Sequence, residues 1–117
     1  GGGPVICKAS LGVFKAIKSE GMLKNAKIMG AYLLEKLTEL KEKFNCILEI
    51  RGLGLMIGVE LSLEVKAVVD ECLKNGLIIN CTQGNVLRIM PALNVNKKQI
   101  DKAIRVLNQA FETVTQK

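Results

Sequence analysis

The sequence predicts an α+β domain, with a small, mainly antiparallel sheet of three to four strands covered by helices. Residues 22–44 and 96–114 repeat apolar side chains at spacings of three and four, as amphipathic helices do. Residues 55–61 alternate between apolar and other side chains, as a half-buried strand does. Two short apolar segments, residues 77–81 and 86–90, are separated by turn residues and complete the set of strands.

The first part of the chain predicts two helices. Pro4 stands where a first helical turn tolerates proline, and apolar residues then recur at helical spacing as far as Gly21, which marks a C-terminal stop. The second helix, over residues 22–44, has the most regular apolar stripe, made of Leu23, Ala26, Gly30, Leu33, Leu37, Leu40 and Phe44.

Strand patterns follow the second helix. Ile47, Leu48 and Ile50 lead into a glycine-rich bend at residues 51–54, and the alternating strand of residues 55–61 comes next. We therefore expect two strands joined by the bend.

The last third of the chain predicts a helix, a hairpin and a final helix. A helical stripe over residues 65–73 ends at Asn75 and Gly76. Residues 82–85 suit a hairpin loop between the strands at 77–81 and 86–90. Asn96 and Gln99 form a capping box, and the helix that they begin has as its buried face Ile100, Ile104, Leu107, Phe111 and Val114.

The composition fits one domain over residues 1–117, because no linker, internal repeat or low-complexity stretch divides the chain. The net charge of +6 raises the question of an acidic partner. The lysines of residues 15–43 are interleaved with glutamates, however, which favours a solvated helix face. Only 3% of the residues are aromatic, so nucleic-acid bases would have little to stack on.

The cysteines and the absence of histidine limit the chemistry. Cys7, Cys46, Cys72 and Cys81 form no CxxC pair, and without histidine too few ligands cluster for a common zinc site. We expect free, reduced thiols and no metal. No signal segment or membrane-spanning run of ~20 apolar residues is present, so we expect a cytoplasmic protein with no membrane partner. Histidine-based catalytic arrangements are excluded.

The segment RGLGLMIGVE at residues 51–60 contains two glycines, Gly52 and Gly54, spaced as at the start of a dinucleotide-binding motif. That motif requires a helix after the glycines, whereas a strand pattern follows Gly54. The two glycines are therefore interpreted as a bend or bulge between strands.

Arg88 is the residue with a candidate chemical role. Alternation along residues 86–90 places it on the face opposite Leu87 and Ile89. A guanidinium in so apolar a strand needs a carboxylate partner, which it can bind through two hydrogen bonds. Two partners remain open: a structural aspartate or glutamate of the same chain, or the carboxylate of a substrate.

Three segments together resemble the C-terminal third of class III pyridoxal-phosphate-dependent aminotransferases. They are GGGPVICKAS at residues 1–10, RGLGLMIGVE at residues 51–60 and NCTQGNVLRIMPAL at residues 80–93. The resemblance covers essentially the whole chain, and residues 80–93 are most similar to the acetylornithine branch. Gly3 stands where the family has asparagine, and Ala92 where it has a second proline.

The resemblance implies that residues 1–117 are the C-terminal small domain of a fold-type I aminotransferase, with the catalytic large domain upstream. The family's enzyme uses pyridoxal 5'-phosphate to move the amino group of N-acetylornithine to 2-oxoglutarate, in arginine biosynthesis. The cofactor's lysine and phosphate-binding segments lie upstream in the family, so we expect no catalytic or cofactor-binding residue, and no bound cofactor, in this segment. Arg88 matches the family's substrate-carboxylate arginine.

The resemblance leaves other functions open. Ornithine and 4-aminobutyrate aminotransferases share the fold and the glycine-rich motif. A non-catalytic interaction module that kept the small-domain fold is an alternative from a different class. The family also implies a homodimer, and we expect the isolated piece to be inactive and to self-associate through apolar surface that the large domain would cover.

Overall fold

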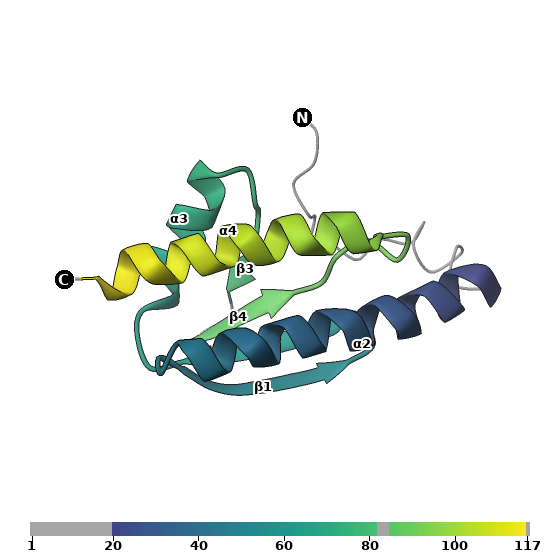
Figure 1. Ribbon diagram of the computed structural model, residues 1–117, viewed down its shortest axis with the longest axis horizontal. Helices are drawn as coiled ribbons and strands as arrows, with labels where there is room; N and C mark the ends of the chain where they lie inside the picture. Colours follow the sequence, from purple (N-terminus) through teal and green to yellow (C-terminus); the bar gives the residue numbers. More distant parts are fainter. Residues whose placement is uncertain (1–19, 82–84, 117) are drawn as a thin grey trace.

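A computed structural model describes residues 20–81 and 85–116 of the chain. The predicted N-terminal helix and Cys7 lie outside this part. Figure 1 shows the described elements, which in chain order are α2 (Glu20–Lys43), β1 (Ile47–Leu53), β2 (Met56–Leu61), α3 (Val65–Lys74), β3 (Asn80–Cys81), β4 (Val86–Ile89) and α4 (Lys97–Thr115).

The four strands form one antiparallel sheet in the order β1-β2-β4-β3. Helix α2 contacts β1, α3 contacts β3 and β4, and α4 contacts both other helices (Figure 1). One apolar core joins these helices to the inward side chains of the sheet. The predicted α+β domain with a small antiparallel sheet is therefore confirmed, and the described residues place no helix on the second face of the sheet.

Helix α2 packs on the sheet through the stripe that the sequence predicts. Leu33, Leu37 and Leu40 are at most 5% exposed. Two expectations are wrong at the N-terminal end: Gly21 lies inside α2 instead of ending an earlier helix, and Leu23 is 49% exposed. The first turns of α2 extend past the end of the strands (Figure 1), so the sheet does not cover the stripe there.

The hairpin of β1 and β2 turns at Gly54 and Leu55, between the paired residues Leu53 and Met56. Gly54 has a φ of +59°, which suits the first loop position of a type II′ hairpin turn. The interpretation of this glycine as a bend between strands is confirmed. The alternation of residues 55–61 is confirmed as well, although Leu55 belongs to the turn and is buried there.

Helix α3 ends in a Schellman motif at the predicted stop. Gly76 has a φ of +83°, its amide donates to the carbonyl of Leu73, and the amide of Leu77 donates to the carbonyl of Cys72. The strand predicted over residues 77–81 is shorter than expected, because only residues 80 and 81 pair with β4. Leu77 and Ile79 are buried without joining the ladder.

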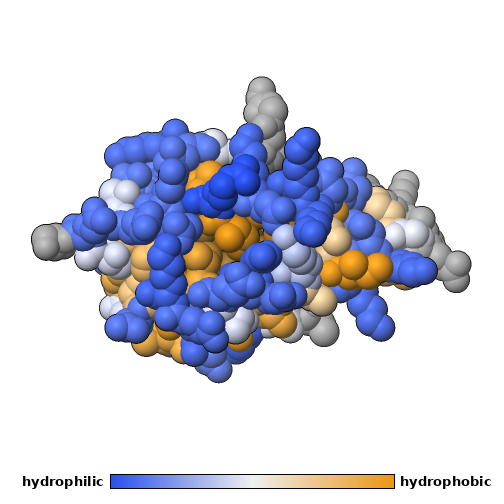
Figure 2. Space-filling model, in the orientation of Figure 1, coloured by the Kyte–Doolittle hydropathy of each residue, from blue (hydrophilic) through white to orange (hydrophobic). Residues whose placement is uncertain are grey.

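Helix α4 begins with the predicted capping box. The Asn96 side chain accepts from the Gln99 amide at 2.8 Å, and the Gln99 side chain accepts from the Asn96 amide at 3.0 Å. Ile100, Leu107 and Phe111 are buried, whereas Ile104 and Val114 are only half-buried. Hydrophilic side chains cover most of the outward surface of α2 and α4, with apolar side chains visible between the two helices (Figure 2).

Candidate functional site

The helix-free face of the sheet brings residues from four strands into one row. The register pairs Gly58 of β2 with Arg51 of β1 and with Arg88 of β4, and Arg88 with Asn80 of β3. Paired residues of neighbouring strands share a face of the sheet. Leu87 and Ile89 are buried toward the helices while Arg88 is exposed, as the alternation of β4 predicts.

Arg88 lines a concavity of about 270 Å³ on this face. The other lining residues come from the neighbouring strands β2 and β4 and from the residue after β4, and they are Met56, Ile57, Gly58, Val86 and Met90. Apart from Arg88, these side chains are apolar, and Gly58 contributes none. The concavity therefore combines a single cation with apolar walls.

The two arginines of the row differ in their partners. Arg51 pairs with Glu60 at 3.2 Å and with Glu49 at 3.7 Å, both on the same face of the sheet. Among residues 20–81 and 85–116, no group forms a hydrogen bond or ion pair with the side chain of Arg88, whose backbone pairs with β2 and β3. The structural ion pair considered for Arg88 is thus not found in the described part of the chain.

This arrangement is suited to binding an anion with an apolar body. The guanidinium offers a planar set of donors that matches a carboxylate. Arg51 is already neutralised by two carboxylates, whereas the Arg88 guanidinium has no carboxylate partner among the described residues. Pockets for small molecules commonly have this composition, with apolar walls and a few polar groups that fix orientation.

The other perturbed groups lie away from the concavity. Burial raises the pKa of the Cys72 thiol to about 12, and burial also raises the pKa of Cys46. Both thiols are free, as predicted. A raised pKa leaves little thiolate at neutral pH, so neither cysteine is suited to nucleophilic chemistry.

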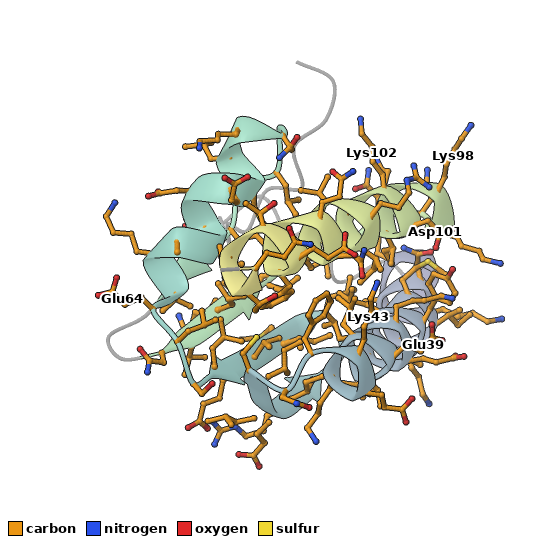
Figure 3. All side chains as sticks on the ribbon, turned by 60° about the vertical axis from the view of Figure 1, so that its left-hand side comes forward. Glu39, Lys43, Glu64, Lys98, Asp101 and Lys102 are labelled. Carbon is orange, nitrogen blue, oxygen red and sulfur yellow. The ribbon has the colours of Figure 1, made fainter. Side chains whose placement is uncertain are left out.

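The described lysines lie on the surface, as the sequence predicts. Lys43 on α2 pairs with Glu112 on α4 at 3.6 Å, and Lys36 pairs with Glu39 at 3.7 Å. Figure 3 shows Lys98 and Lys102 projecting from α4 away from the fold. No charged side chain is buried within the described residues, and no cluster of metal-ligating side chains occurs among them.

No helix in the described part of the chain is long and apolar enough to span a membrane.

Sequence reasoning found Arg88 but missed the residues around it. Gly58 and Met56 become neighbours of Arg88 only through the pairing of β2 with β4, whose closest paired residues, Glu60 and Val86, are 26 positions apart in the sequence. The only local signal was that Gly58 interrupts an alternating strand.

Comparison with known proteins assigns the class. The family model described as aminotransferase class-III matches residues 1–111, and the chain belongs to this family. The acetylornithine aminotransferase of Methanosarcina mazei is 44% identical over 110 residues, which are 94% of this chain and 27% of that protein. The acetylornithine aminotransferase of Methanocaldococcus jannaschii is 42% identical over 116 residues, covering 97% of this chain and 29% of that protein.

The solved structures agree with the fold. Lysine aminotransferase from M. tuberculosis superimposes with a TM-score of 0.81 at 28% identity, over 88% of this chain and 24% of that one. This chain spans between a quarter and a third of the length of the two acetylornithine aminotransferases, at 27% and 29%. The resemblance to class III aminotransferases predicted from the three sequence segments is confirmed.

Proposed function

We propose that this chain is the C-terminal small domain of a transaminase that moves the amino group of N-acetylornithine to 2-oxoglutarate. Six acetylornithine aminotransferases, between 34% and 44% identical, support this substrate. The large domain would lie upstream of residue 1. A cytoplasmic homodimer that acts in arginine biosynthesis completes the proposal.

The cofactor of the family is pyridoxal phosphate, which supplies the electron sink for amino-group transfer when it is bound. The lysine that holds it must sit in a pocket that lowers its pKa. The described lysines are on the surface, with none buried, so the residues present do not fit this role. In the proposal, the cofactor is held by the large domain, and this segment contributes substrate binding.

We assign the binding of a substrate carboxylate to Arg88. The observation that carries this assignment is a guanidinium that lines an apolar concavity and has no partner among the described residues. N-acetylornithine, 2-oxoglutarate and the product glutamate all carry carboxylates. A carboxylate held by two parallel N–H donors is fixed in orientation as well as in place, which is what a reacting substrate requires.

Kinetics of the full-length enzyme test this proposal. Arg88→Ala should lower kcat/KM by about 10- to 150-fold, which corresponds to the roughly 1.5–3 kcal/mol of a hydrogen bond to a charged group. Assays with N-acetylornithine, ornithine and 4-aminobutyrate as amino donors determine the substrate. If the Arg88→Ala enzyme has unimpaired kinetics with each donor, the assignment of Arg88 is wrong. If no donor transfers its amino group, the proposed activity is wrong.

A further inference from the structure

Gly58 lacks the structural reasons that require glycine at Gly30, Gly52, Gly54 and Gly76. Gly54 and Gly76 have positive φ angles. At Gly30 an added Cβ would lie 2.3 Å from the carbonyl oxygen of Gly54, and at Gly52 it would lie 2.9 Å from the Ile57 side chain. At Gly58 the φ is not positive, and the nearest atom to an added Cβ is Val86 Cγ1 at 3.4 Å. The fold would therefore accept a side chain at residue 58.

A glycine inside a strand carries a cost. It packs nothing and loses more conformational freedom on folding than other residues, and it often marks a place where a ligand or another backbone comes close. Gly58 lies near the middle of β2, paired with Arg88 on one side and with Arg51 on the other. A side chain here would extend into the concavity that Arg88 lines.

We propose that Gly58 determines the room for the substrate carboxylate, whose oxygens bind Arg88 while the carboxylate carbon lies over the Gly58 backbone. This inference rests on the proposed function of Arg88. The walls formed by Met56, Val86 and Met90 contact the aliphatic part of the substrate next to that carboxylate. The chemical class that the site takes is therefore a carboxylate on an aliphatic chain, because one cation and apolar walls line it.

The test is a size series at residue 58 in the full-length enzyme. Gly58→Ala should fold as well as the wild type, since the nearest atom permits a Cβ, and the folding of Gly58→Val is checked by its unfolding free energy before its kinetics are read. The KM for the substrate that binds Arg88 should rise with side-chain size. For valine, kcat/KM should fall by about 10²-fold, because a small displacement of a substrate has effects on that scale. Cofactor content and its absorbance should not change. Ala67→Val, at an exposed position on α3, is the matched control for added volume and should leave the kinetics unchanged.

Each other result overturns the inference. Loss of stability in Gly58→Ala would mean that the fold itself requires glycine. Loss of cofactor or of the native assembly in Gly58→Val would mean that the space accommodates another part of the protein. Unchanged KM in the valine variant would mean that nothing binds over residue 58. Arg88→Ala, assayed in parallel, separates the two proposals: if it is unimpaired while Gly58→Val is impaired, the role of Arg88 is wrong and the space over Gly58 serves a different group.

Discussion

At the residue scale, Tyr32 joins α2 to α4. Its hydroxyl donates a hydrogen bond to the Asp101 carboxylate, and Lys36 and Lys97 lie over its ring at 5.5 and 5.3 Å from the ring centre. The bond to Asp101 raises the pKa of Tyr32 to about 12, because ionisation would remove the O–H that donates this bond and would place a phenolate beside a carboxylate. The hydrogen bond therefore links α2 to α4.

The raised pKa of Tyr32 predicts an alkaline titration. Tyr32 is the only tyrosine and the chain has no tryptophan, so its phenolate absorbance can be read directly. At pH 11 about a tenth of Tyr32 should be ionised in the folded chain, against about nine-tenths of a tyrosine with the ordinary pKa of ~10. Asp101→Asn should move the titration toward pH 10. A titration near pH 10 in the unchanged chain would show that the bond contributes nothing.

The same pair predicts the pH dependence of stability. Because the folded pKa is raised, the contribution of Tyr32 to the free energy of unfolding is fully present below about pH 10 and is lost as the pH rises toward 12. Tyr32→Phe should therefore have a flatter stability profile over this window. Urea unfolding of the two proteins at pH 9 and pH 11 measures the difference, and parallel profiles would contradict the prediction.

Replacing Gly30 should disturb the contact of α2 with the β1–β2 turn. An added Cβ would lie 2.3 Å from the carbonyl oxygen of Gly54, so helix or turn must move. Gly30→Ala should lower the free energy of unfolding by about 1–3 kcal/mol, despite the better helix propensity of alanine. Gly21→Ala, at an exposed position of α2, is the control and should be neutral or slightly stabilising. Equal stability of both variants would show that the contact is not tight.

At the element scale, the sequence predicted what depends on local pattern. The alternation of β2, the Schellman motif of α3 and the capping box of α4 are each set by residues within a few positions, and all are confirmed. The errors occur where tertiary contacts decide. Leu23 fits the stripe of α2, but the sheet ends before reaching it, and residues 77–79 have strand-like composition although β3 covers only Asn80–Cys81.

The core contacts of α2 and α4 predict unequal effects of truncation. Leu37 is 1% exposed, so Leu37→Ala should cost about 2–5 kcal/mol of unfolding free energy. Ile104 was expected to be equally buried, but it lies at the groove between α2 and α4 and is only half-buried. Ile104→Ala should therefore cost less than Leu37→Ala. Chemical denaturation checks this order, and a reversed order would contradict the assigned faces.

The candidate site was predicted only in part for the same reason. Alternation within β4 placed Arg88 on the face away from the core, and the family resemblance gave it a role. The partners of Arg51 and the absence of a described partner for Arg88 depend on the register between strands. That register is set by packing across the sheet, which no local pattern encodes.

At the scale of the whole molecule, the sheet has one face covered by helices and one face with none among the described residues. Met56 is 63% exposed and Leu48 is 50% exposed. Exposed apolar side chains favour contact with other protein where they gather on an uncovered face. We therefore predict that the isolated chain forms dimers or larger species, which light scattering at high concentration measures.

Two substitutions locate this contact. Met56→Lys places a charge on the helix-free face and should favour the monomer, whereas Leu73→Lys, on an exposed apolar residue of α3, should not. A chain that is monomeric at high concentration would exclude self-association. A chain whose association responds only to Leu73→Lys would place the contact on α3 instead of the sheet.

The central claim is that Arg88 binds a carboxylate of the substrate, and it is tested most directly by removing that group from the substrate. The full-length enzyme and its Arg88→Ala variant are compared with three amino acceptors: 2-oxoglutarate, succinic semialdehyde, which lacks the carboxylate next to the carbonyl, and 2-oxobutyrate, which lacks the distal one. With 2-oxoglutarate the variant should lose about 10- to 150-fold in kcat/KM. With one of the two shortened acceptors this loss should disappear, since the group that Arg88 holds is already absent. An equal loss with all three acceptors would contradict the account, because Arg88 would then act on the enzyme without touching either carboxylate.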